Sequence, residues 1–386
     1  MNKKIERLLF KKIHSGIFGF TDYGLFLLRN IQNIIVKTMF NIDFQEVMLP
    51  ILLNSDLFLK SGRSQDFMSE MFNIKKENLS LSPTCEESAL LFIEPVYEKD
   101  LPRKIFQISR KFRNELRPRY NILRGKEFIM KDGYSFHLSS KDLNSTYLEV
   151  KAAYLRFFKI LELNNDVINI SLSKDDNMLS DYSEEFLIKF HTGSSKIGFC
   201  PRCKLYFDIN KEEHDHEIID IFNCIEIGHI FKLLTHFSKT LKVKTYHQKK
   251  EIFMGCYGIG ISRLLYVMMN KFFDKKNNHW NLPQSISFSS LNIIIDHDIV
   301  LNQNIKNFVK DFRKNNWFIN INHHNHNLTD KIKESRYQGF NWMLIYKRKI
   351  QQYVLENREK KFIFSNLKEI KNFLKIEENK YFEQLF

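Results

Sequence analysis

FRNELRPRYNILRGKEFIMKDGYSFH, from Phe112 to His137, decides the fold of this 386-residue chain. Arg113 and Glu115 are two residues apart, so on an extended strand they project from the same face. A turn containing proline and asparagine follows, and the returning segment brings Arg124 and Phe128 back toward Arg113. The pattern predicts an antiparallel hairpin that offers two guanidinium groups and an aromatic ring to a nucleotide triphosphate. By composition alone, a surface hairpin with solvated charges is the favoured alternative.

A second stretch, MGCYGIGISRLL, runs from Met254 to Leu265. Its apolar start predicts a strand, and Gly258 and Gly260 allow close backbone approach before a helix. Arg263 would lie in the first turn of that helix, where a triphosphate can bind at the N-terminus. A GxGxxR pattern is weak by itself, and it lacks the third glycine of a dinucleotide site. Beside the hairpin, it predicts the second wall of an ATP site.

These stretches resemble motifs 2 and 3 of the class II aminoacyl-tRNA synthetases, and the hairpin is similar to the prolyl-tRNA synthetase version. QEVMLPILLNSDLFLKSGR, from Gln45 to Arg63, resembles motif 1. LSPTCEE, from Leu81 to Glu87, resembles the proline-pocket loop, with Cys85 where the family usually has histidine. NCIEIGHIFKLLTHFS, from Asn223 to Ser238, resembles the segment that precedes motif 3. All five matches stand in the family's order.

The resemblance implies that L-proline and ATP, with Mg²⁺, form prolyl-adenylate and that tRNA(Pro) then accepts the prolyl group. It implies catalytic roles for Arg113 and Arg263. The expected ATP-binding residues are Arg113, Glu115, Arg124, Phe128, Glu226, Gly258, Gly260 and Arg263, with Glu226 as the candidate Mg²⁺ ligand. The expected proline-binding residues are Thr84, Glu86, Arg113 and His229.

Two positions depart from the family pattern. Lys126 stands where the family usually has arginine, so a point charge replaces a bidentate fork. Lys232 stands where glutamine is usual, which puts its nucleotide contact in question. The resemblance also implies the short form without an inserted editing domain, because residues 138–199 are too few to hold a second catalytic domain.

The expected fold class is α+β. Residues 1–285 carry all five matches and are expected to form the class II catalytic domain, an antiparallel sheet with flanking helices. Residues 290–386 alternate between strand and helix patterns, which predicts a small α/β domain placed like the family's anticodon-binding domain. The polar residues 274–283 between them predict a linker.

The formal net charge of +14 favours a polyanionic partner, which the resemblance identifies as tRNA. Motif 1 implies a homodimer. The sequence has no apolar stretch of the ~18 residues that would span a membrane, and its start has no small-residue cleavage site. We therefore expect a cytoplasmic protein without a membrane partner.

Five cysteines, an odd number in a long chain, favour a reducing compartment over a disulfide framework. Cys200 and Cys203 form CPRC, and His214, His216 and Cys224 follow. A CxxC pair with later ligands could bind zinc, but the second half lacks a standard spacing. A metal-free turn is therefore favoured over a structural zinc site.

Two other functions stay open. The first is another class II synthetase, for threonine, histidine, glycine or serine. The second is a non-catalytic relative that binds tRNA without charging it. The intact set of Arg113, Glu115, Arg124 and Arg263 favours an enzyme, because a binding protein has no need of an ATP site.

Overall fold

The computed structural model describes residues 7–385, except 64–66, 68, 117, 119–120, 173–181, 212–213, 296–302, 323–326 and 348–350. The chain divides into two compact units. The central unit comprises Lys11–Gly19 and Ile31–Val267, and the terminal unit comprises Met1–Phe10, Phe20–Asn30 and Met268–Phe386. In the described parts of the chain, no helix is long and apolar enough to cross a membrane.

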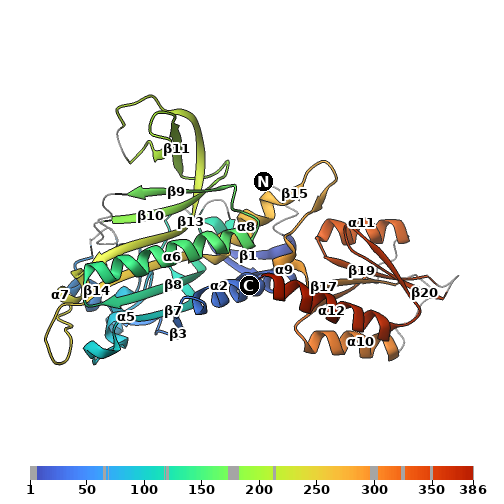
Figure 1. Cartoon of the computed structure of the whole chain (residues 1–386), viewed down its shortest axis with the longest axis horizontal. Coiled ribbons are helices and arrows are strands. Elements are labelled where there is room, and N and C mark those ends of the chain that lie inside the picture. Colours follow the sequence, from blue (N-terminus) through green and yellow to red (C-terminus); the bar gives the residue numbers. More distant parts are fainter. Residues whose placement is uncertain are drawn as a thin grey trace. The chain divides into compact units, whose positions relative to one another are not determined.

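A nine-stranded sheet is the framework of the central unit (Figure 1). Its strands follow the order β12-β11-β13-β14-β8-β7-β3, and β10 pairs with β13 and β9. The pairings are antiparallel apart from that of β3 with β7. This sheet confirms the predicted α+β class. The strands are β3 (Gln45–Glu46), β7 (Arg103–Phe112), β8 (Glu127–His137), β9 (Val167–Leu172), β10 (Tyr182–Lys189), β11 (Ser195–Cys200), β12 (Leu205–Asp208), β13 (Ile219–Leu234) and β14 (Phe253–Gly260).

The hairpin stretch forms the predicted antiparallel pair. β7 pairs with β8 from Arg103 to Phe112, and residues 113–126 make the connection. Arg113 and Arg124, which were predicted to lie on the two strands, are therefore in the connection. The Arg113 amide still donates to the Lys126 carbonyl at 2.9 Å, so the connection begins as a continuation of the ladder.

The long helix α6 (Ser140–Ile160) contacts β8, β13 and β14 and lies across the sheet (Figure 1). The Ser139 hydroxyl caps it by accepting a hydrogen bond from the Asp142 amide. Its buried side chains recur at the spacing of an amphipathic helix. They are Leu143, Thr146, Tyr147, Val150, Ala153, Tyr154, Phe157 and Phe158.

A second core of the central unit surrounds α5 (Glu86–Phe92). Ala89 and Leu90 of this helix are buried with Phe136 of β8 and Met254 of β14. Other elements wholly or partly in the unit are β1 (Phe10–His14), β2 (Ile17–Phe20), α2 (Asp22–Phe40), β4 (Leu52–Asn54), α3 (Asp56–Lys60), β5 (Phe72–Ile74), β6 (Leu79–Leu81), α7 (His236–Thr240) and α8 (Ile261–Lys271). β4, β6 and β5 form a three-stranded sheet.

The terminal unit contains a five-stranded sheet in the order β18-β17-β19-β20-β21. β17 is parallel to β18 and β19, and the other pairings are antiparallel. The elements are α9 (Gln284–Ser287), β17 (Ser290–Ile294), α10 (Gln303–Lys314), β18 (Phe318–Asn322), α11 (Leu328–Gln338), β19 (Trp342–Lys347), β20 (Gln352–Glu356), β21 (Lys361–Phe364) and α12 (Leu367–Leu385). The predicted alternation of strands and helices is confirmed, but the sequence pattern did not predict the short edge strand β21.

The segment predicted as a linker is partly structured. β15 (Phe273–Asp274) pairs with β16 (His279–Trp280). The Trp280 side chain is buried, and its indole donates to the Met269 carbonyl at 2.7 Å. The linker prediction was wrong here because a single aromatic ring fixes a segment whose composition is polar.

Lys131, on β8, is a fully buried cation beneath α6. Its ammonium group donates to the Tyr154 hydroxyl at 2.9 Å and to the Tyr257 carbonyl at 3.3 Å. Burial lowers the pKa of Lys131 to about 7, although Asp132 and Cys256 act in the opposite direction. The group therefore releases its proton more easily in the folded chain than in the unfolded chain.

Replacing Lys131 by methionine should flatten the pH dependence of stability. An unfolded lysine keeps its proton up to about pH 10.4, so between about pH 7 and pH 10 the unfolded state binds one proton more. Stability should then rise with pH by up to about 1.4 kcal/mol per unit, and this rise should be lost in Lys131→Met. Denaturant unfolding at pH 7, 8 and 9 measures how stability changes with pH in the wild type and in Lys131→Met. Equal slopes in the two proteins would contradict the assignment of this pH dependence to Lys131.

Candidate active site

Arg113 lies immediately after β7 and is half-buried. Its guanidinium carbon is 5.3 Å from the centre of the Phe128 ring, which confirms that the returning strand brings this ring to Arg113. A terminal nitrogen is 3.5 Å from the Pro83 carbonyl oxygen. Burial lowers the pKa of Arg113, Glu226 raises it and Arg263 lowers it. Two neighbouring guanidinium groups make this region attractive to an anion.

Arg263 lies in the first turn of α8, as predicted. Its guanidinium donates to the Glu226 carbonyl at 2.8 Å and to the Leu123 carbonyl at 3.3 Å. The Ile129 amide donates to the Ser262 hydroxyl at 2.7 Å, which joins α8 to β8. These bonds hold Arg263 between β13 and the hairpin connection.

Gly258 and Gly260 lie on β14, and the packing of the protein itself does not require them. Apart from chain neighbours, a Cβ atom would meet nothing closer than 3.7 Å at Gly258 or 3.6 Å at Gly260. At Gly255, by contrast, a Cβ would lie 2.2 Å from the Tyr257 hydroxyl. A Cβ at either position would therefore make ordinary van der Waals contact, with the Arg263 side chain in the case of Gly260.

Arg124 forms an ion pair with Glu115 within the hairpin connection. The Arg124 side chain is 59% exposed and the Glu115 side chain 17% exposed. Such an exposed pair stabilises a protein by only about 0–1 kcal/mol. A phosphate could therefore replace the carboxylate as the partner of Arg124 at small cost.

A fully buried ion cluster lies at the loop that leads into α5. The Arg63 guanidinium contacts Glu86 at 2.8 Å and Glu87 at 2.9 Å. Glu86 also accepts hydrogen bonds from the Thr84 hydroxyl at 2.7 Å and from the Cys256 thiol at 3.2 Å. The sequence analysis placed Arg63 at the end of the motif 1 segment but gave it no role, because its partners are distant along the chain. An ammonium group bound at Glu86 would have to share this carboxylate with Arg63.

Cys85 takes part in a second buried network. Its sulfur accepts a hydrogen bond from the Lys111 ammonium group at 2.9 Å, and Lys111 is 3.0 Å from Asp132. Asp132 also accepts from the Tyr134 hydroxyl and the Gln107 amide, both at 2.9 Å. Burial would lower the pKa of Lys111, but Asp132 and Cys85 raise it to about 12. The network fixes Cys85, which lies between Thr84 and the start of α5 at Glu86.

His229 and Glu226 lie together on β13, and Glu185 of β10 joins them. The imidazole Nδ1 is 3.8 Å from the Glu226 carboxylate and 3.9 Å from the Glu185 carboxylate. Its ring stacks on Phe231 with centroids 3.8 Å apart. Burial and the charge of Glu226 raise the pKa of Glu185 to about 7, against the effect of Lys211. The sequence reasoning missed Glu185, whose strand carried no recognised motif.

The two lysines that depart from the family pattern have different surroundings. The Lys126 ammonium group donates to the Asn114 side chain at 3.3 Å, within the hairpin connection. The Lys232 ammonium group donates to Asn144 of α6 at 2.8 Å and lies 4.7 Å from the centre of the Tyr147 ring. Lys232 therefore points toward α6, whereas His229 points toward the carboxylates.

The sequence model of the tRNA synthetase class II core domain (G, H, P, S and T) matches residues 68–272, so the chain belongs to the class II tRNA synthetases. Proline–tRNA ligase of Wolbachia sp. subsp. Drosophila simulans (strain wRi) is 34% identical over 307 residues, which cover 72% of this chain and 71% of the relative. The Pelagibacter ubique (strain HTCC1062) proline–tRNA ligase is 30% identical, and the alignment covers 91% of this chain and 88% of the relative. Within its class, the chain belongs to the proline–tRNA ligase family.

Solved structures share the fold. Giardia lamblia prolyl-tRNA synthetase in complex with prolyl-adenylate has a TM-score of 0.69 and 17% identity, over 94% of this chain and 72% of that chain. Cryptosporidium parvum prolyl-tRNA synthetase complexed with L-proline and AMP has a TM-score of 0.67 and 16% identity, over 99% and 79%.

Proposed function

We propose that the chain joins L-proline to ATP as prolyl-adenylate, with release of pyrophosphate, and then transfers the prolyl group to tRNA(Pro) with release of AMP. The observation that carries this proposal is that Arg113 lies over Phe128 and Arg263 is bonded to the hairpin connection, in a member of the proline–tRNA ligase family. As a step of protein synthesis, the reaction would take place in the cytoplasm.

The first step brings two anions together. The proline carboxylate attacks the α-phosphorus of ATP, so positive groups must be fixed beforehand. Arg113 would contact both the carboxylate and the α-phosphate, while Arg263 and Arg124 would bind the outer phosphates. Phe128 would stack on the adenine ring and Glu115 would bind its amino group.

The amino-acid pocket would be formed by Thr84, Glu86, Arg113 and His229. The buried Glu86 carboxylate supports this role because it can accept hydrogen bonds from a secondary ammonium group. In the second step, the terminal ribose hydroxyl of tRNA attacks the adenylate carbonyl and AMP leaves. An oxygen of the substrate phosphate could accept the hydroxyl proton, so no covalent intermediate with the protein is required.

The residues near Arg263 fit a magnesium ion. Glu226 and Glu185 offer carboxylate oxygens, the ligands that Mg²⁺ prefers, and these oxygens lie within 4.8 Å of each other. Mg²⁺ bound there would neutralise part of the phosphate charge. We propose Glu226 as the principal ligand, because its side chain is 40% exposed and so remains accessible to ATP.

Amino-acid-dependent exchange of pyrophosphate into ATP tests the first step without tRNA. Proline should support exchange, and alanine should give a weaker signal because an apolar pocket discriminates by about 1–3 kcal/mol per methylene. Arg113→Ala should lower the rate by on the order of 10²–10³, the effect of losing a group that stabilises transition-state charge. The matched control, Arg110→Ala, removes an exposed arginine paired with Glu127 and should stay near wild type.

Each outcome of this assay is informative. Exchange with threonine, histidine, glycine or serine would favour another class II specificity. No exchange with any amino acid by folded protein would favour a non-catalytic tRNA-binding relative. An active Arg113→Ala variant would contradict the proposed site.

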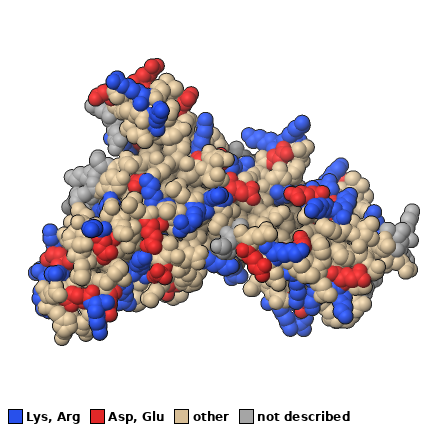
Figure 2. All heavy atoms as spheres, viewed as in Figure 1, with Lys and Arg blue, Asp and Glu red and all other residues tan. Residues whose placement is uncertain are grey.

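We propose that α10 in the terminal unit contributes to tRNA binding, in an anticodon-binding-like domain that begins near residue 290. Figure 2 shows Lys and Arg side chains at the lower edge of this unit, where Figure 1 places α10. A hollow on this helix is lined by Lys306, Val309, Lys310, Arg313, Lys314 and Ile321. Clustered cations on one helix face fit a phosphate backbone.

Charge reversal at Lys306 and Lys310 should weaken tRNA charging without affecting pyrophosphate exchange. The double variant should raise the KM for tRNA. The slope of log affinity against log salt concentration should be smaller by about two, because each lost phosphate contact removes about one. Aminoacylation at 50 and 200 mM salt gives both values. Lys360→Glu, in the exposed β20–β21 turn, is the control; the same loss in this control would contradict a specific role for α10.

We propose a homodimer built on the motif 1 segment. β3 is the last strand in the sheet order, and the nearby Met48 and Leu52 side chains are 90% and 45% exposed. Exposed apolar groups beside a free sheet edge are typical of an interaction surface.

Light scattering should return twice the chain mass of 46.4 kDa. Met48→Glu should shift the mass toward one chain, because a charge would be buried in the interface. Ile363→Glu, a 64% exposed position of the terminal unit, should leave the mass unchanged. A wild-type protein that remains a monomer at micromolar concentration would refute the proposal.

A further inference from the structure

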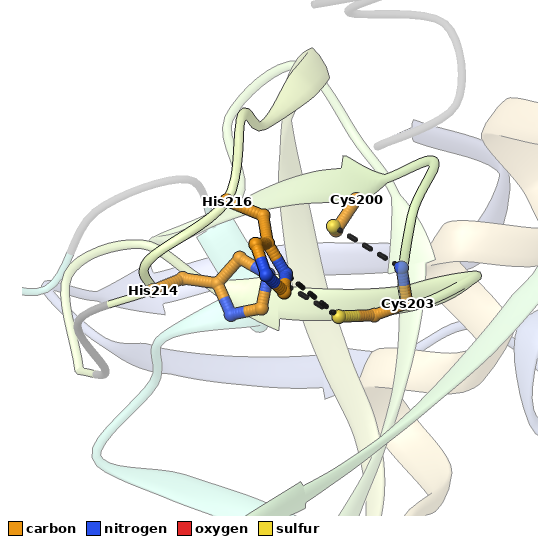
Figure 3. Close-up of side chains that lie close together, drawn as sticks. All are labelled: Cys200, Cys203, His214 and His216. Carbon is orange, nitrogen blue, oxygen red and sulfur yellow. Dashed lines mark hydrogen bonds between the residues drawn. The ribbon is translucent and has the colours of Figure 1, made fainter.

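The turn between β11 and β12 is shaped like a metal-binding knuckle. Cys200 ends β11 and Cys203 lies in the turn. The Cys203 amide is 3.4 Å from the Cys200 sulfur, and the Lys204 amide donates to the Cys200 carbonyl at 2.8 Å. Lys204 has φ +56°, the left-handed conformation that closes the turn. The two thiols consequently face the same region (Figure 3).

Two histidines approach these thiols from the segment after β12. His214 Nε2 is 3.6 Å and His216 Nδ1 is 3.3 Å from the Cys203 sulfur. The His214 ring stacks on Phe207 with centroids 4.0 Å apart, which orients the imidazole. Figure 3 shows both rings directed toward the sulfurs.

The spacing of these atoms matches a tetrahedral zinc ion. Zinc–sulfur bonds of ~2.3 Å and zinc–nitrogen bonds of ~2.0 Å at the tetrahedral angle put sulfur and nitrogen about 3.5 Å apart. The Cys203 sulfur is 3.6 Å from the His214 nitrogen and 3.3 Å from the His216 nitrogen. All four ligand atoms lie within 4.8 Å of one another. To bind an ion, the Cys203 sulfur and the two histidine nitrogens would need to move by only tenths of an ångström.

The surroundings give a reason for a cross-link. Ile197 and Cys224 belong to a buried cluster at the base of β11, whereas Leu205 and Ile221 are 58% and 57% exposed. β12, β11 and the start of β13 form a sheet end with exposed apolar side chains, which has little core to hold the β11–β12 turn. Cys224 belongs to the base cluster and is outside the group of four ligands.

We propose that Cys200, Cys203, His214 and His216 bind one structural Zn²⁺ that fixes the β11–β12 turn. Two thiolates and two imidazoles suit zinc, and four protein ligands leave no position for a substrate. Both cysteines are free thiols in the structure. Ligand spacing along the sequence favoured a metal-free turn, whereas the distances between the four ligand atoms favour a zinc site. The site is separate from the proposed activity.

Metal content is the first test. Untagged full-length protein, incubated with excess ZnCl₂ and then desalted, should retain one zinc per chain by plasma mass spectrometry. Cys203→Ser and His216→Ala should lose it. Cys224→Ala and His191→Ala replace the same residue types outside the group and should retain it. Zinc below one tenth per chain in wild type, or equal zinc in all variants, would overturn the proposal.

Cobalt and thiol measurements on the wild type do not depend on whether a variant folds. Co²⁺ in place of zinc should give the intense visible bands of tetrahedral coordination and a thiolate-to-cobalt charge-transfer band; an octahedral spectrum would refute the site. Thiol titration in denaturant with chelator and no reductant should count all five cysteines. Two fewer would show a disulfide in place of the metal site. None of these measurements uses pyrophosphate exchange, so the zinc site and the proposed activity can fail separately.

Discussion

The buried interaction of Arg63 with two carboxylates is the constraint on which the proposed amino-acid pocket depends. Glu86 and Glu87 are adjacent and fully buried, and one guanidinium group contacts both. Two buried anions without that cation would be strongly unfavourable, since removing one partner of a buried pair typically costs about 3–5 kcal/mol. The cluster thus joins the end of the motif 1 segment to the first turn of α5. With the Cys85 network, it holds Thr84 in place before any substrate binds.

The proposed nucleotide site is built differently, because its cations are held by carbonyl groups and an aromatic ring. Arg263 donates to two backbone carbonyls, and Arg113 lies over Phe128. Their mutual repulsion is part of what lowers the pKa of Arg113. Fixed cations that repel one another gain most from a polyanion between them, which is the basis of preorganised catalysis. Gly260 lies beside Arg263, whose Cβ would be 3.6 Å from a Cβ on the glycine.

Much of the fold was predictable because its signals are local. Helix α8, the β7–β8 hairpin and the alternating elements of the terminal unit follow from periodicity, glycine placement and turn residues. The nearness of Phe128 to Arg113 follows from hairpin pairing. Patterns failed where a tertiary contact overrides composition, as for Trp280 in a polar segment. They also failed for Arg63 and Glu185, which meet their partners across many intervening residues.

The sequence by itself determined the class, because the ordered motifs, the hairpin with two arginines and the strand–glycine–helix unit are each a local pattern of backbone and charge. Only the tertiary structure decided which side chains share a space. It joined Cys200 and Cys203 to two histidines at a spacing that no standard motif describes, and it turned Lys232 toward α6. The physical reason is that strand pairing and burial set distances between residues that are remote in the chain, and a linear pattern contains no such distances.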